Sequence, residues 1–161
     1  MRPMPSGFPA WHRRRAVAAW AACALAAYGM VYCDLWLRAR AAFREGEKYL
    51  EWNRHPGLKA ACLDRTLAVH TARLQAQQLA SRITPQDLDR RLALARFARD
   101  EAMKESSLKY AYVWFQTAAE LFSPPESRWV LLSRKRMPEA RRLWKAELDS
   151  RHVRYQDYML E

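Results

Sequence analysis

The chain has 161 residues, a net charge of +11 and only four glycines, and half of its residues are hydrophobic. This length suits one compact domain, and scarce glycine beside long runs of Ala, Leu and Arg indicates an all-α fold. The sequence contains no HExxH, GxSxG, phosphate-binding glycine loop or dinucleotide fingerprint, and its cysteines and histidines never stand at metal-ligand spacing. It therefore predicts no enzyme, no cofactor and no metal site.

The first predicted element is a hydrophobic helix over residues 16–37. Within it, Ala16–Cys33 is 18 residues long and carries no charge. At about 1.5 Å per residue this stretch spans about 27 Å, close to the hydrocarbon thickness of a bilayer. Basic residues precede it and aromatic rings lie near its end, as is typical of membrane–water interfaces. The residues expected at these interfaces are Arg13, Arg14, Arg15, Tyr32 and Trp36.

We predict that this segment is an uncleaved single-pass membrane anchor, preceded by a basic tail over residues 1–15. A cleaved signal peptide is the main alternative, with Arg13–Arg15 as its basic start and Ala24-Leu25-Ala26 as its cleavage site. The apolar run continues beyond that site to Tyr32, which favours the anchor. A buried core helix and a mitochondrial targeting segment remain open, the latter because the first fifteen residues contain arginine and no acid.

The charges that flank the span bear on its orientation. Basic residues occur on both sides, but the Arg13–Arg15 triplet directly abuts the apolar run and those on the other side are dispersed. The positive-inside rule therefore favours a cytoplasmic N-terminus. We expect a bacterial inner-membrane protein with a periplasmic C-terminal domain, and the mitochondrial inner membrane is the alternative.

The anchor is expected to continue into a helical stalk over residues 38–53. This segment has no proline, a single Gly46 and an intermittent apolar face. The stalk would project a helical domain, residues 54–155, away from the bilayer. Residues 156–161 are expected to form a short C-terminal tail.

Proline-containing signals divide the domain into helices. Pro56-Gly57 predicts a turn, and Thr84-Pro85 predicts a capped helix start. Ser123-Pro124-Pro125-Glu126 has the pattern of a capping box with proline at the first helical position. Met137-Pro138 predicts a helix break, because proline lacks the N–H that a helix interior needs. The expected helices cover residues 58–81, 85–105, 108–122, 124–136 and 138–155.

Small and aromatic residues in the second half of the domain follow the spacing of two closely paired helices. In this sequence they are Ala111, Phe115, Ala118, Pro124 and Trp129. The segment resembles the second helix of a tetratricopeptide repeat and the start of the next repeat. The resemblance covers roughly residues 95–148 in degenerate form. An ordinary helical bundle with the same aromatic residues in its core is the alternative.

The resemblance implies a concave groove lined by the first helices of the repeats. Arg99, Trp129 and Arg136 are the residues that we would assign to partner binding on this basis. The sequence departs from the family pattern at Ser133, where glycine is usual, and the unit that follows is several residues short.

These features predict a protein-interaction scaffold or adaptor anchored in the membrane. Its expected partners are the lipid bilayer and other membrane or membrane-associated proteins. The alternative is an accessory structural subunit built permanently into a larger membrane complex. Basic and acidic residues alternate, as in Asp87–Arg91 and Arg99–Glu101, which is typical of solvated helix faces, so nucleic-acid binding is not expected.

Overall fold

A computed structural model describes the backbone of residues 10–156 and the side chains of residues 15–156. Within that range the chain forms five α-helices and no strand. In chain order they are α1 (Ala10–Arg54), α2 (Pro56–Leu79), α3 (Pro85–Lys104), α4 (Ser107–Glu120) and α5 (Arg128–Ser150). The predicted all-α fold is therefore confirmed over the described part of the chain.

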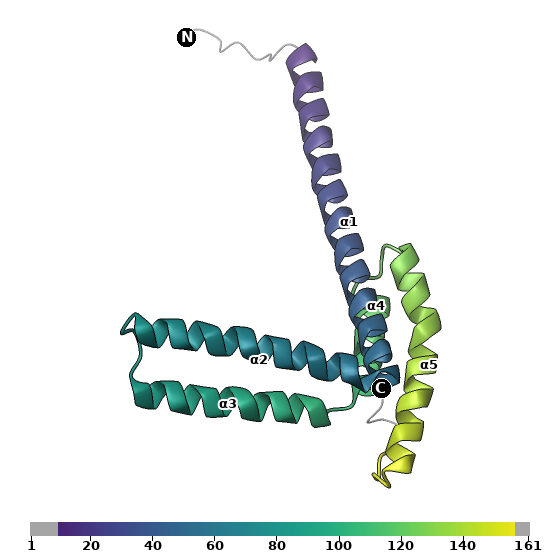
Figure 1. Ribbon diagram of the computed structural model, residues 1–161. Helices are drawn as coiled ribbons and strands as arrows, with labels where there is room; N and C mark the ends of the chain where they lie inside the picture. Colours follow the sequence, from purple (N-terminus) through teal and green to yellow (C-terminus); the bar gives the residue numbers. More distant parts are fainter. Residues whose placement is uncertain (1–9, 157–161) are drawn as a thin grey trace.

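The five helices form three parts (Figure 1). The first half of α1 extends away from the rest of the protein as a single helix. The second half of α1 packs with α4 and α5 into a three-helix unit. Helices α2 and α3 form an antiparallel pair, which we call the arm, and the arm projects sideways from the three-helix unit.

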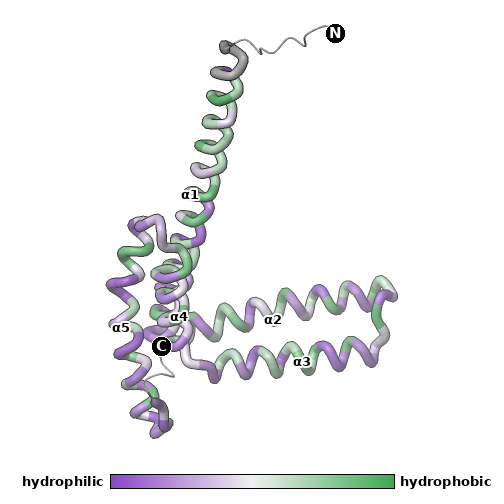
Figure 2. Tube along the Cα trace, turned by 180° about the vertical axis from the view of Figure 1, so that it is seen from behind, coloured by the Kyte–Doolittle hydropathy of each residue, from purple (hydrophilic) through white to green (hydrophobic). Residues whose placement is uncertain are grey.

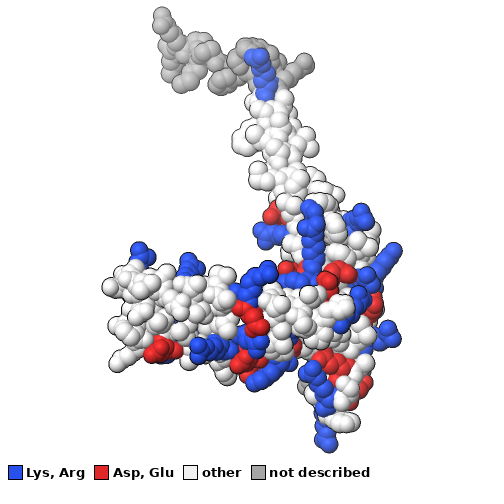
Figure 3. All heavy atoms as spheres, in the orientation of Figure 1, with Lys and Arg blue, Asp and Glu red and all other residues white. Residues whose placement is uncertain are grey.

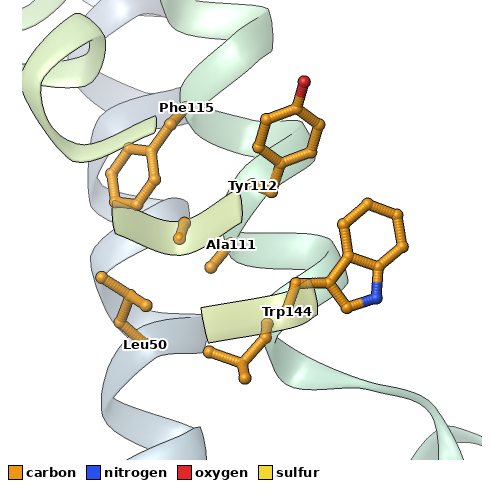
Figure 4. Close-up of a cluster of buried hydrophobic side chains, with 7 residues drawn as sticks. Leu50, Ala111, Tyr112, Phe115 and Trp144 are labelled. Carbon is orange, nitrogen blue, oxygen red and sulfur yellow. The ribbon is translucent and has the colours of Figure 1, made fainter. Parts of the chain in front are cut away.

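The three-helix unit has a hydrophobic core to which all three helices contribute (Figure 4). Its buried members are Leu50 of α1, Leu108, Ala111, Tyr112 and Phe115 of α4, and Ala140 and Trp144 of α5. The α4 residues recur at helical spacing and therefore lie on one face of that helix. Burial of this face between α1 and α5 supplies the main hydrophobic stabilisation of the unit.

The second half of α1 differs from the free stalk that the sequence predicts over residues 38–53. Ala39, Ala42 and Leu50 are buried, because α4 and α5 pack along this part of α1. The intermittent apolar face of the segment is one side of the core. The folded unit consequently lies alongside α1 instead of being carried at its end.

α1 and α4 pack closely at Gly46. It is the only described glycine at which an added Cβ would meet another residue. The ring of Phe115, which is fully buried, lies directly against it. A Cβ atom built on Gly46 would stand 2.6 Å from the nearest ring carbon, well inside van der Waals contact. Phe43 packs against the same ring, with the two ring centroids 5.7 Å apart. The absence of a side chain at Gly46 is therefore what lets the two helices meet.

Local signals mark the starts of three helices. The sequence predicts a turn at Pro56-Gly57, but both residues lie inside α2, and only His55 separates α1 from α2. The hydroxyl of Thr84 accepts a hydrogen bond of 3.1 Å from the N–H of Asp87 and caps α3. The hydroxyl of Ser106 accepts one of 3.2 Å from the N–H of Lys109 and caps α4.

The predicted start of a helix at residue 124 is wrong. α5 begins at Arg128, because Ser127 accepts the capping hydrogen bond from the N–H of Val130 at 3.4 Å. The glutamate of the Ser123–Glu126 segment pairs with Arg134 instead of closing a capping box. The prolines of this segment therefore lie in the connection between α4 and α5.

The predicted break at Met137-Pro138 is also wrong, because α5 continues through Pro138. A proline inside a helix costs about 3 kcal/mol. The residues before and after it nevertheless lie on one buried face of α5, which packs against α4. The buried residues on that face are Val130, Ser133, Ala140 and Trp144. Burial of both halves outweighs the local penalty.

We expect Gly46→Ala to destabilise the three-helix unit by about 1–3 kcal/mol, because the new methyl group must displace the buried ring of Phe115. The penalty persists although alanine favours a helix over glycine by about 1 kcal/mol. Gly57→Ala is the matched control, since nothing lies within 4 Å of a Cβ at Gly57. Unfolding of the full chain in mild detergent, followed by circular dichroism, measures both. Equal stability of the two variants would contradict the packing at Gly46.

Candidate functional site

The arm consists of two helices that pack along a narrow seam. Apolar residues on both helices occur at helical spacing and are at least partly buried where the helices meet. They include Leu63, Leu67 and Leu74 of α2 and Leu88, Leu92 and Ala95 of α3. Among all of them only Leu74 is fully buried, and α3 has no buried residue. Two helices alone cannot enclose a core, so apolar surface stays exposed on the arm.

A groove of about 310 Å³ lies on one face of the arm, between α2 and α3. It is lined by Leu63, Thr66, Leu67 and His70 of α2 and by Ala95, Ala98, Arg99 and Ala102 of α3. Most of this lining is apolar, and the short alanine side chains of α3 leave the space open. An apolar groove between two helices is a shape that accepts the apolar face of a third, amphipathic helix.

Apolar surface extends beyond the groove along the arm. Leu94 and Phe97 of α3 are 61 % and 63 % exposed, and Val69 of α2 is 66 % exposed. Of these residues, Val69 adjoins the groove, because it lines a hollow that shares Thr66 and His70 with it, and exposed apolar patches mark interaction sites. Arg65 and Arg73 border a second hollow beside Val69, and neither forms an ion pair with another described residue. The groove is therefore largely apolar, and the hollow that adjoins it on α2 carries two basic residues.

A buried lysine holds the base of the arm together. The ammonium group of Lys59, near the start of α2, donates hydrogen bonds to the carbonyl oxygens of Met103 at 3.2 Å and Glu105 at 2.7 Å. These carbonyls lie at the end of α3, where a helix leaves acceptors without partners. Burial lowers the pKa of Lys59 from its ordinary value. Lys59 thus fixes α2 to α3 where both leave the three-helix unit.

Glu105 continues this tether into the three-helix unit. Its carboxylate accepts a hydrogen bond of 2.6 Å from the hydroxyl of Tyr110, and this bond raises the pKa of Tyr110 to about 12. The ring of Tyr110 stacks on Tyr49 of α1, with centroids 5.2 Å apart. The direction of the arm is thereby set at the junction of α1, α3 and α4.

Arg99 is the one predicted partner-binding residue that lies at the groove. Its guanidinium joins α3 to α2 through Asp64 at 2.7 Å and also contacts Asp100 at 2.9 Å. Its hydrogen bonds to Asp100 and Asp64 raise the pKa of Arg99. Arg99 therefore stays charged at the groove, and two carboxylates balance its charge.

The other two predicted residues, Trp129 and Arg136, lie on α5 and face α1. Trp129 packs edge-on against Trp36, with ring centroids 6.3 Å apart. Arg136 forms an ion pair of 2.9 Å with Glu47. Both contacts hold α5 against α1. The structure does not bring the three predicted residues together into one surface.

The predicted interface residues of the membrane segment lie along α1. Arg15 and Tyr32 are exposed and Trp36 is half-buried, whereas the side chains of Arg13 and Arg14 lie outside the described residues. α1 is long and apolar enough to cross a membrane, and no part of its apolar stretch is buried in the protein. Figure 2 shows this stretch as hydrophobic, and Figure 3 shows it free of charged side chains on the visible face.

The sequence reasoning missed the groove itself. Its signal is the row formed by Ala95, Ala98 and Ala102, short side chains on one side of α3 that face leucines of α2. The same row would also be expected in a helix buried within a bundle. Only the arrangement of the helices shows that this face of α3 is open.

Neither a metal centre nor a known relative directs the interpretation. Among the described side chains, no group of three or more His, Cys, Asp or Glu is placed to hold a metal ion. No protein-family model, curated protein or solved structure matches the chain. The groove and the apolar helix are therefore the two features of the described chain that point to a function.

We expect Lys59→Met to destabilise the base of the arm by about 1.5–3 kcal/mol, because two carbonyl groups lose a charged donor. Lys104→Met is the control, since it removes only an exposed pair with Glu101 and should leave the stability of the arm almost unchanged. Amide hydrogen exchange across α2 and α3 measures the effect locally, and exchange should accelerate in the first variant. If the two variants exchange alike, Lys59 does not hold the arm.

Proposed function

We propose that this protein is a single-pass membrane-anchored adaptor that binds a partner protein through its arm. The observation that carries the proposal is the open apolar groove between α2 and α3, which no other described part of the chain covers. The groove offers a binding surface, and the chemistry around it suits recognition instead of catalysis. The apolar half of α1 provides the anchor.

The geometry of α1 sets the height of the arm above the bilayer. If Trp36 marks the interface, about 20 residues separate it from the start of α2, which corresponds to about 30 Å along a helix. The arm projects sideways from α1 at that height (Figure 1). A partner that docks there must itself lie close to the membrane, so we infer a membrane or membrane-associated protein.

The chemistry of the groove defines the partner segment. Its apolar floor suits the apolar face of an amphipathic helix, with contacts at helical spacing. Arg65 and Arg73 beside it have no acidic partner among the described residues. We therefore propose an amphipathic helix whose polar edge is acidic. Binding should weaken as salt concentration rises, because exposed charges are screened.

An accessory subunit of a membrane complex is the second candidate, and the anchor favours it. The span is rich in alanine, and nothing lies within 4 Å of a Cβ at Gly29. Small residues of this kind let another membrane helix approach closely. An adaptor should purify alone as a monodisperse species in mild detergent. A built-in subunit should instead co-purify in fixed stoichiometry or be degraded without its complex.

We expect Ala98→Arg to abolish partner binding, because the long side chain fills the groove from an exposed position on α3. Ala93→Arg is the matched control: Ala93 is also an exposed alanine of α3, but it does not line the groove. Both variants should keep the helix content and stability of the wild type. The measurement is quantitative recovery of co-purifying chains after mild detergent extraction.

The informative result is a chain recovered with the wild type and with Ala93→Arg but lost with Ala98→Arg. Recovery of the same chain with all three proteins would exclude the groove as the docking site. Loss with both variants would indicate that α3 tolerates no arginine, and the groove would then be probed with Ala98→Gln.

We also propose that the N-terminus is cytoplasmic and that the three-helix unit and arm lie across a bacterial inner membrane, in the periplasm. The arginine triplet next to the span supports this orientation. Alkaline phosphatase fused after the last residue should then be active, and green fluorescent protein at the same position should be dark. The reverse pattern would place the arm in the cytoplasm.

A further inference from the structure

One end of the three-helix unit lies beside the residues of α1 that directly follow its apolar segment. Tyr110 of α4 stacks on Tyr49, and Phe115, further along α4, packs on Phe43. α4 therefore runs back along α1 toward the anchor. The connection between α4 and α5 follows, and α5 begins where Trp129 meets Trp36 (Figure 1).

Trp36 gives this end of the unit a depth relative to the bilayer. The charge-free segment ends at Cys33, and Asp34 pairs with Arg38 at 2.8 Å in the next turn. Trp36 thus stands at the boundary between apolar and polar residues of α1, where indole rings favour the headgroup region. Trp129 contacts it directly and must lie at the same depth.

The connection between α4 and α5 has the composition of a membrane-contacting loop. Residues 121–125 contain no charge and include Leu121, which is 71 % exposed, as well as Phe122 and two prolines. An exposed leucine at this position is costly in water and favourable in the headgroup–acyl boundary. The loop begins directly after α4, at the end of the unit nearest the anchor.

Arginines stacked on the tryptophans complete this surface. The guanidinium of Arg40 lies 5.7 Å from the ring centroid of Trp36 and 5.8 Å from that of Trp129. Arg128 lies 5.7 Å from the Trp129 ring. Arginine stems on aromatic faces with their charged ends toward water are typical of membrane interfaces.

We propose that this end of the three-helix unit rests on the bilayer, with Leu121 and the exposed edge of the half-buried Phe122 inserted into the headgroup region of the leaflet that α1 leaves. The proposal rests on the membrane anchor of the proposed function, and the occupant of this surface is the lipid bilayer itself. Glu120 and Glu126 offset most of the charge of Arg40, Arg128 and Arg134, the last of which pairs with Glu126, so the surface carries only a small positive charge. Apolar insertion therefore drives the contact, and a neutral phosphatidylcholine bilayer suffices.

This contact between the three-helix unit and the bilayer would have a structural consequence. A single spanning helix leaves a domain free to tilt and rotate about its anchor. A second contact beside the first removes that freedom and holds α1 close to one inclination. The arm then stays at a fixed height and projects along the membrane surface.

The test uses single-cysteine versions of the full chain, labelled with the environment-sensitive fluorophore NBD, in phosphatidylcholine nanodiscs. The native thiols Cys23, Cys33 and Cys62 are free and exposed, so alanine can replace them. One protein carries Leu121→Cys. A second carries Leu79→Cys, which is 84 % exposed at the tip of the arm and serves as the control away from the membrane. A third retains only Cys23, inside the span.

Quenching by phosphatidylcholine that is spin-labelled close to the headgroup reports contact with the bilayer. We expect quenching at Leu121→Cys to exceed that at Leu79→Cys by at least about twofold, with a blue-shifted emission. Quenching at Cys23 by a lipid spin-labelled deep in the acyl chain shows that the span is embedded.

The outcomes separate the two proposals. If Cys23 is quenched but Leu121→Cys behaves like Leu79→Cys, the proposed contact of the three-helix unit with the bilayer is wrong, and the proposed membrane anchor is supported. If Cys23 is not quenched, the anchor and this contact both fail. Far-ultraviolet circular dichroism confirms that each labelled protein keeps its helices.

Discussion

The contact of Phe115 with Gly46 determines where the folded unit lies. α1 is one continuous helix from Ala10 to Arg54, so its apolar first half and its packed second half share a single axis. A buried ring seated where a helix lacks a side chain cannot slide by a turn without losing its contacts, because protein cores are close-packed. Whatever fixes the axis of α1 therefore also fixes α4 and α5.

The arm follows from the same arrangement. α1 and α4 are neighbours in space, and the chain between them leaves as α2 and returns as α3. The hydrogen bonds of Lys59 and Tyr110 fix only the base of the arm. Along its length the arm buries little apolar surface, which predicts lower local stability than in the three-helix unit. A third helix in the groove would supply the burial that the arm lacks.

Local signals in the sequence predict the start of α3, and they fail at the Ser123–Glu126 segment and at Pro138, where contacts made by α5 decide. Thr84 caps its helix because the cap needs only residues three positions apart. Pro138 was expected to end a helix, and the burial of α5 on both sides of it overrides that tendency. The sequence predicts a stalk over residues 38–53, because an intermittent apolar face does not show which other helices will pack against it. The groove cannot be predicted for a related reason. A row of alanines that includes Ala98 is expected on α3 whether another helix covers that face or leaves it exposed.

If α1 is anchored in a bilayer as proposed, the fixed position of the groove relative to α1 would affect how a partner is selected. The groove itself is apolar and offers few polar groups, so its chemistry accepts many amphipathic helices. With α1 anchored as proposed, position would supply the selectivity that chemistry lacks, because the arm would stand about 30 Å along α1 from the interface and its base is fixed by hydrogen bonds. Only a helix presented at that height, by a protein held at the same membrane, would then meet the groove at high effective concentration. A flexible stalk would remove this constraint, whereas the packing of α4 and α5 along α1 keeps the arm in place.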